Sequence, residues 1–182
     1  TLKAFDGDLA TLRGLIAEIG GRAEKAVEGA MTALTNHDLD LARQVVEGDK
    51  RIDALEDQID RMVIQTIALR APMADDLREL VAALKISGVV ERIGDYAKNI
   101  AKRVALIDPA QHIDAARLLP AMADATRQLV DDAFTAFARR DADLAVAVCA
   151  QDKTVDDFYN SIFRALIAHM IATPEHVGAG TH

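Results

Sequence analysis

"DLDLARQVVEGDKRIDALEDQI" (residues 38–59) is the stretch that decides the fold, because its pattern returns 103 residues later as "DADLAVAVCAQDKTVDDFYNSI" (residues 141–162). The matching pairs are Asp38 and Asp141, Leu41 and Leu144, Val45 and Val148, Asp49 and Asp152, Ile52 and Val155, Asp53 and Asp156, Leu55 and Phe158, and Ile59 and Ile162. Apolar and acidic positions recur together, which indicates an internal duplication.

The first copy also predicts its own secondary structure. Its apolar residues follow alternating steps of four and three, the period of coiled-coil packing. This seam comprises Leu41, Val45, Gly48, Ile52, Leu55, Ile59, Met62, Thr66 and Leu69. Asp38 is a suitable N-cap, and Pro72 cannot continue a helix, so we expect one helix over residues 39–69. The carboxylates of Asp49, Asp53, Glu56 and Asp60 follow one flank of the seam, where we expect mostly a solvated face.

Helical periodicity extends over most of the chain. The further expected helices span residues 7–35, 75–107, 114–139 and 142–172, with "DPAQHID" (residues 108–114) as a linker. With the duplication, this pattern predicts an all-α protein of two tandem three-helix bundles, in which the second bundle lacks its final helix. The expected domains are residues 1–108 and residues 109–182.

The missing helix follows from the repeat. Counterparts of Glu91 and Asp95 in the second copy would fall near positions 194 and 198, beyond His182. We therefore expect the sequence to be a truncation or the ordered part of a longer protein. The apolar seam of the second bundle then needs cover from a partner chain or from a shift of its helices, or else the second bundle is poorly ordered. We also expect a homodimer.

Composition narrows the class of protein. The 182 residues are 51% hydrophobic and 27% charged, which suits a packed core, and the net charge of −8 argues against nucleic acid as a partner. The single cysteine, Cys149, lies in an apolar run and is expected to be packed and inert. The absence of a long apolar span or a signal-peptide hydrophobic region in these residues predicts a cytoplasmic location.

The expected third helix carries a column of short oxygen ligands, Glu91, Asp95 and Asn99. A helical projection centred on Ile93 places an apolar stripe on one face and the three oxygen ligands on the opposite face. The stripe comprises Ala82, Ile86, Val89, Ile93, Ile100 and Val104. Two carboxylates four residues apart either pair with neighbouring basic residues in solvent or bind a hard cation such as Mg, Mn, Ca or Fe. Two ligands are too few for a stable site, so other helices must contribute.

The segment "ALRAPMADDLRELVAALKISGVVERIGDYAKNIAKR" (residues 68–103) resembles the PhoU family of phosphate-transport regulators. The family shares the ALRxPxAxDLR opening and the ERIGDxAxNIA helix in two tandem copies. The resemblance implies two three-helix bundles with metal-binding acidic motifs. Here these map onto Glu91 and Asp95, with Asn99 as a neighbour, and Asp49, Asp53, Asp152 and Asp156 are further candidates. The implied cofactor is a divalent or trivalent metal ion: Mg, Mn, Fe or Zn.

The resemblance further implies an adaptor rather than an enzyme. Family members negatively regulate phosphate uptake and the phosphate-starvation response. The implied partners are the ATPase subunit of the phosphate ABC transporter and a sensor histidine kinase, so the protein would reach the membrane only through partners. The alternatives are an accessory subunit of another phosphate transporter, a structural metal-binding helical protein, and a carboxylate-metal enzyme or metal store. The last would need Glu-x-x-His pairs on facing helices, and the sequence shows none.

Overall fold

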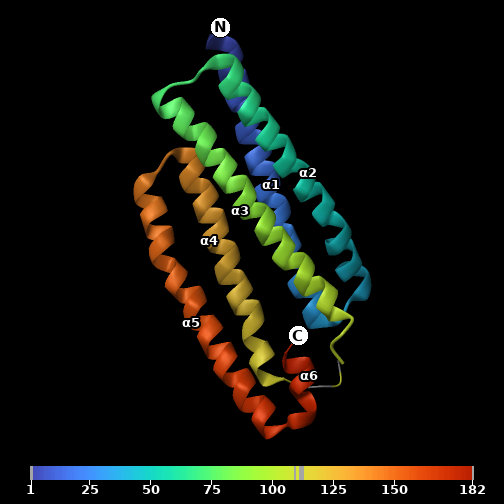
Figure 1. Cartoon of the computed structure of the whole chain (residues 1–182). Coiled ribbons are helices and arrows are strands. Elements are labelled where there is room, and N and C mark those ends of the chain that lie inside the picture. The colour runs from blue at the N-terminus through green and yellow to red at the C-terminus, as the bar shows by residue number, and fades with distance from the viewer. Residues whose placement is uncertain (1, 109, 111–112, 182) are drawn as a thin grey trace.

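The computed structural model of the chain describes residues 2–108, 110 and 113–181 (Figure 1). The long helices are α1 (Leu2–Asn36), α2 (Leu39–Arg70), α3 (Ala74–Val104), α4 (Leu119–Arg139) and α5 (Ala142–Ala172). The short ones are the 3₁₀ helices η1 (Asp114–Leu118) and η2 (Pro174–His176) and the single turn α6 (Val177–Gly180). The described part of the chain contains no strand, so the predicted all-α class is confirmed. Pro109, Gln111 and His112 of the expected linker lie outside the described residues.

Local sequence signals set the helix ends. The Asp38 carboxylate accepts hydrogen bonds from the backbone N–H groups of Asp40 and Leu41, and its repeat counterpart Asp141 accepts one from Leu144. These bonds satisfy N–H groups that have no partner within the helix. The expected helix over residues 114–139 instead begins as η1 and becomes α-helical at Leu119. Pro120 lies in the first turn of α4, where its missing N–H costs no hydrogen bond.

Helices α1, α2 and α3 form an antiparallel bundle in which each helix packs against both others. The core residues that α2 contributes are Val45, Ile52, Leu55, Ile59, Val63 and Thr66, together with Ala42 and the acidic Asp49. The predicted seam of this helix is therefore correct over its middle. Gly48 and Leu69 were assigned to the seam but are exposed. Asp49 was expected on a solvated flank and is instead buried.

The buried face of α3 differs from the predicted one by about one residue. It comprises Leu80, Ala83, Ser87, Val90, Gly94, Ala97, Ala101 and Val104. Most of these side chains are small, so neighbouring helices approach closely. The larger aliphatic residues that defined the predicted stripe lie beside this face, and Val89 is 61% exposed. Of the stripe, only Val104 is fully buried.

Helix α4 packs against α1, and α5 packs against the outer side of α4 (Figure 1). Phe134 of α4 lies against the backbone of α1 at Gly20, where an added Cβ would approach the ring to 2.6 Å. The only large hydrophobic residue of α5 that is buried among the described residues is Ile162. The exposed hydrophobic residues of α5 include Val146, Tyr159, Phe163, Ile167 and Ile171.

An ion-pair network joins the first bundle to the turn between α4 and α5. The buried carboxylate of Glu79 on α3 accepts hydrogen bonds from Arg13 of α1 at 2.6 and 2.9 Å, and also from Arg140 of the α4–α5 turn. The three residues are far apart in sequence, so no local pattern indicated this contact. Among the described residues, no helix has the length and apolar character needed to cross a bilayer.

Candidate metal-binding site

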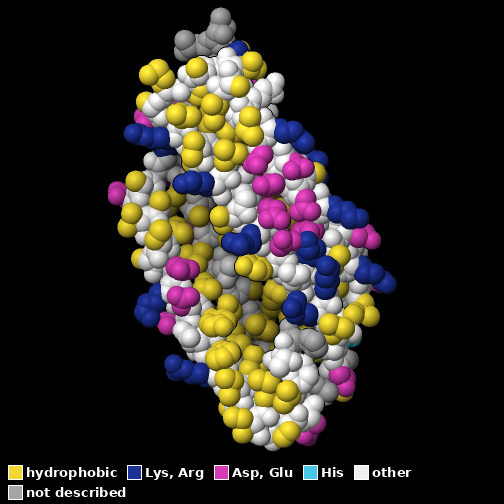
Figure 2. All heavy atoms as spheres, in the orientation of Figure 1, with side chains coloured by type: hydrophobic (Ala, Val, Ile, Leu, Met, Phe, Trp, Pro, Cys, Tyr) yellow, Lys and Arg dark blue, Asp and Glu magenta, His cyan; other side chains and the backbone are white. Residues whose placement is uncertain are grey.

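The candidate site lies where α2 and α3 approach each other at Gly94. A Cβ on Gly94 would lie 2.8 Å from Ile52 Cδ1 and 3.4 Å from Asp49 Oδ1. Glycine therefore allows α2 to come close enough for its carboxylates to face those of α3. Figure 2 shows acidic side chains gathered over α2 and its junction with α3, with basic side chains beside them.

Asp49 is the buried member of this group. Its residue exposure is 4%, and its Oδ1 atom has no hydrogen-bond partner among the described residues. The other oxygen, Oδ2, accepts a hydrogen bond from Lys98 Nζ, which also donates to Asp95 Oδ1. A single ammonium group thus links a carboxylate of α2 to a carboxylate of α3.

Four carboxylates influence one another here, and we call Asp49, Asp53, Glu91 and Asp95 the acidic cluster. Burial raises the pKa of Asp53, and the negative charge of Asp49 raises it further. Burial likewise raises the pKa of Glu91, with contributions from the charges of Asp95 and Asp53. Burial is the larger cause in both residues, and the neighbouring carboxylates act in the same direction.

Asp95 behaves in the opposite way. The hydrogen bond from Lys98 lowers the pKa of Asp95, and the positive charges of Lys98 and Lys102 act in the same direction. The hydrogen bonds that Lys98 makes to the carboxylates of Asp49 and Asp95 in turn raise the pKa of Lys98 above the usual range for lysine. The cation is therefore firmly charged and shared between Asp49 and Asp95.

The donor set of the acidic cluster suits a hard metal ion. It offers carboxylate oxygens from two helices, and the unpartnered Asp49 Oδ1 lies within it. In the described part of the chain, however, no group of three or more His, Cys, Asp or Glu side chains is already arranged to hold a metal. Lys98 lies between the carboxylates that would have to converge. The chemistry of these donors fits such an ion, although their arrangement in this structure does not form a ready-made site.

The structure separates the predicted site residues into two groups. Glu91 and Asp95 lie half-buried on the flank of α3 next to α2 rather than opposite the core, near the buried Asp49 and the exposed Asp53. Asn99 is exposed and shares none of the interactions described for the cluster. The remaining candidates, Asp152 and Asp156, are exposed on α5. The helices that α5 contacts are α4, η1, η2 and α6, and none of them faces these two residues with a comparable acidic motif.

Sequence reasoning missed the burial of Asp49 and its ion pair with Lys98, whereas the pairing of Asp95 with a neighbouring basic residue was one of its two alternatives, and Lys98 is that residue. A seam drawn from Val45 continues equally well at position 48 or 49, and hydropathy favoured Gly48. The spacing of four that leads from Val45 to Asp49 was the available signal. Lys98 follows Asp95 by three residues, a spacing at which helical side chains meet, but its contact with α2 required the fold.

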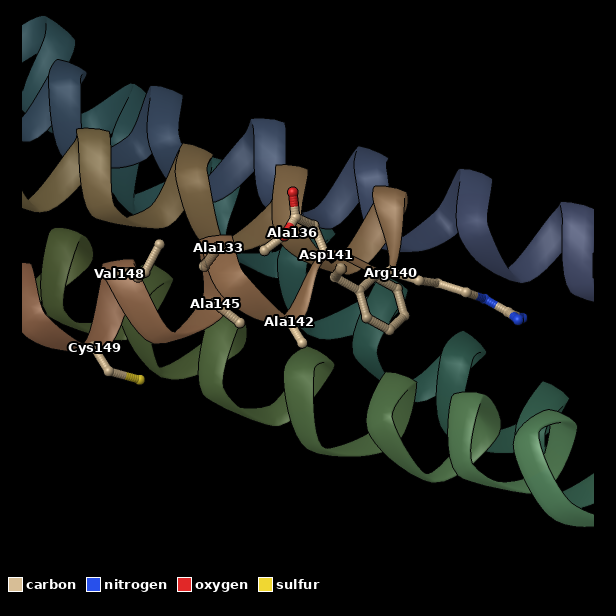
Figure 3. A pocket seen from close by; sticks show the side chains of 9 residues that line it. Ala133, Ala136, Arg140, Asp141, Ala142, Ala145, Val148 and Cys149 are labelled. Atoms are coloured by element: carbon tan, nitrogen blue, oxygen red, sulfur yellow. The ribbon is translucent and has the colours of Figure 1, made fainter.

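Apart from the acidic cluster, a groove lies between α4 and α5, near the turn that joins them (Figure 3). This groove measures about 450 Å³. Its lining residues are Ala133, Ala136, Phe137, Arg140, Asp141, Ala142, Ala145, Val148 and Cys149. Cys149 was expected to be packed but is exposed at the edge of this groove. The groove offers few polar groups and no cluster of potential ligands, so it is not the candidate site.

Comparison with known proteins agrees with the arrangement of helices. The PhoU domain profile matches residues 16–104 and 119–179. The "phosphate-specific transport system accessory protein PhoU homolog" of Zymomonas mobilis subsp. mobilis is 44% identical over 182 residues, which cover all of this chain and 77% of that protein. The "phosphate-specific transport system accessory protein PhoU" of Escherichia coli (strain K12) is 36% identical over 167 residues, covering 92% of this chain and 69% of that protein.

Solved structures show the same fold. The crystal structure of PhoU from Pseudomonas aeruginosa superimposes with a TM-score of 0.92 at 34% identity, over 97% of this chain and 85% of that one. PhoU from Streptococcus pneumoniae gives a TM-score of 0.90 at 24% identity, over 97% of this chain and 83% of that one. With a domain profile that matches most of its length and a 44% identical relative whose alignment covers the whole of it, this chain belongs to the PhoU family.

Proposed function

We propose that this protein is an accessory protein of phosphate-specific transport that acts by regulation and not by catalysis. The observation that carries the proposal is the 44% identity, over the whole chain, to a protein named for that role. The long helices with exposed apolar and charged residues suit contacts with other proteins.

The finer part of the proposal concerns partners. We propose that the protein works in the cytoplasm as an adaptor between the ATPase subunit of the phosphate ABC transporter and a sensor histidine kinase. It would restrain phosphate uptake and the starvation response, reach the membrane only through these partners, and act as a homodimer. The resemblance of residues 68–103 supports this reading, and size-exclusion chromatography with light scattering would measure the oligomeric state.

A pull-down tests the adaptor role. Tagged protein is recovered from extracts of phosphate-replete and phosphate-starved cells, with an unrelated acidic helical protein of similar size as the control bait. We expect the transporter ATPase and a histidine kinase with the protein but not with the control. Recovery of a subunit from a different phosphate transporter would favour the alternative accessory role. Absence of both expected partners in both conditions would contradict the adaptor proposal.

We also propose that the acidic cluster binds a metal ion, with Asp49, Asp53, Glu91 and Asp95 as its ligands. Two features support this: the all-oxygen donor set and the unpartnered Asp49 Oδ1. Mg, Mn and Fe match these donors better than Zn, which prefers nitrogen and sulfur ligands. A bound ion would neutralise the cluster and cross-link α2 to α3.

The metal site is tested by replacing two ligands. Glu91→Ala combined with Asp95→Ala should weaken Mn²⁺ binding in calorimetric titration while leaving helicity nearly unchanged, because alanine favours helix. The matched control combines Asp152→Ala with Asp156→Ala, which also removes two carboxylates four residues apart, on exposed positions of α5. Equal heats from the wild type and the Glu91/Asp95 variant would remove the metal site from the proposal.

A further inference from the structure

Lys98 lies between two of the carboxylates of the proposed metal site. Its ammonium donates simultaneously to Asp49 Oδ2 on α2 and to Asp95 Oδ1 on α3. The Asp49 side chain is only 5% exposed, and a buried carboxylate is strongly destabilising without a positive partner. Among the described residues, Lys98 is the basic side chain that forms an ion pair with Asp49. It is therefore the counter-ion of Asp49.

The single ammonium of Lys98 does not satisfy all the carboxylate oxygens of the acidic cluster. Asp49 Oδ1 remains without a hydrogen bond, Asp53 adds negative charge beside Asp49, and Glu91 adds it beside Asp53 and Asp95. A divalent cation carries twice the charge and accepts six or more oxygen ligands, whereas an ammonium offers three donors. The same oxygens therefore suit a metal ion better than they suit lysine.

The Lys98 ammonium can also move into solvent. The Lys98 side chain is 21% exposed, and the Asp95 side chain is 41% exposed, so this end of the cluster opens to solvent. Lysine is long and flexible, and its head group is strongly hydrated once outside. Movement of the side chain alone would free one oxygen of Asp49 and one of Asp95.

We propose that Lys98 is a built-in competitor for the metal, so that a metal ion binds the acidic cluster by displacing the Lys98 ammonium from Asp49 and Asp95. The inference rests on the metal site of the proposed function. It assigns Lys98 as the residue that sets the affinity of the site, although it is not itself a ligand.

Calorimetric titration with Mn²⁺ tests this assignment on the wild type, Lys98→Gln and Lys102→Gln under the same pH and salt. Lys98→Gln removes the competitor, and we expect its Mn²⁺ affinity to rise by about tenfold, as expected for loss of a charge-assisted hydrogen bond. Lys102→Gln is the matched control, since it removes the same charge from the same helix. Lys102 acts on Asp95 only through space, so its variant should change affinity by less than about threefold.

The outcomes separate this inference from the metal site itself. Equal affinity in the wild type and Lys98→Gln, or weaker binding in Lys98→Gln, would overturn the competition while leaving the metal site in place. Mn²⁺ binding by neither protein would overturn both.

A labelling measurement on the wild type remains decisive if Lys98→Gln fails to fold. An amine-reactive reagent is applied with and without saturating Mn²⁺, and the modified lysines are identified by mass spectrometry. We expect labelling of Lys98 to increase several-fold with Mn²⁺ and labelling of Lys102 to stay constant. Unchanged labelling of Lys98 in Mn²⁺-loaded protein would overturn the proposal.

Discussion

At the scale of single residues, the two aspartates of the repeat show how position determines chemistry. Asp49 and Asp152 are equivalent in sequence, and both lie near the middle of a long helix. Asp49 faces α3 and is buried, whereas Asp152 is exposed on α5. The same residue type is therefore a candidate ligand in one copy and a solvated charge in the other.

This contrast gives a prediction. Asp49→Asn keeps the shape of the side chain but removes the charge, so Mn²⁺ affinity should fall by at least about tenfold, and the free energy of unfolding by roughly 1–2 kcal/mol as Lys98 loses a partner. Asp152→Asn should change both quantities very little, as exposed substitutions usually do. Calorimetry and urea unfolding measure the two effects. Similar results from the two variants would show that burial of Asp49 is irrelevant to the site.

At the scale of elements, α3 is defined by its small residues. Ser87, Gly94, Ala97 and Ala101 form much of its buried face and let α2 approach, while Ile93 lies beside that face. Hydropathy assigns large apolar residues to the core. The buried face predicted from the sequence therefore differs from the observed face by a rotation of about one residue around the helix axis. The close packing of small residues becomes visible only when the neighbouring helices are in place.

Two glycines of α3 separate the effect of packing from that of helix propensity. At Gly88 an added Cβ meets open space, whereas at Gly94 it meets Ile52. Gly88→Ala should raise the free energy of unfolding by about 0.5–1 kcal/mol. Gly94→Ala should lower it by roughly 1–2 kcal/mol, because overpacking exceeds the gain in propensity. Guanidinium unfolding gives both values, and Ile52→Val should partly rescue Gly94→Ala. Equal stabilisation by both alanines would contradict the close approach of α2 and α3.

The helices themselves could be predicted from the sequence because their signals are local. Asp38 and Pro72 predicted helix ends that the structure reproduces within a few residues. Glu91 and Asp95 could be identified as candidate ligands because both lie in one short motif. Their counterparts across the α2–α3 junction could not be chosen with certainty, since the rotation of each helix depends on contacts distant in sequence.

At the scale of the whole molecule, the Glu79 network links the first bundle to the α4–α5 turn. The hydrogen bonds from Arg13, followed by those from Arg140, lower the pKa of Glu79 despite its burial. A carboxylate with a lowered pKa in the folded state contributes stability above its ordinary pKa. That contribution is lost as the pH falls through the lowered folded-state value.

Glu79→Gln should therefore destabilise the protein by about 1–2 kcal/mol at neutral pH. The difference from the wild type should shrink as the pH falls below the ordinary glutamate range. Asp75→Asn is the matched control, because the ion pair of Asp75 with Arg78 is fully exposed and on the same helix. Thermal unfolding between neutral and acidic pH measures both. A Glu79→Gln deficit that is independent of pH would show that the ion pairs are not its cause.

The most direct test of the central claim, that the acidic cluster between α2 and α3 is a metal site, is anomalous X-ray diffraction from crystals of the protein grown with Mn²⁺. The account predicts an anomalous peak between α2 and α3, within bonding distance of the carboxylates of Asp49 and Asp95, with Lys98 turned away from both. Fully loaded crystals with no peak at this position, or with peaks only beside exposed carboxylates such as Asp152 and Asp156, would contradict it.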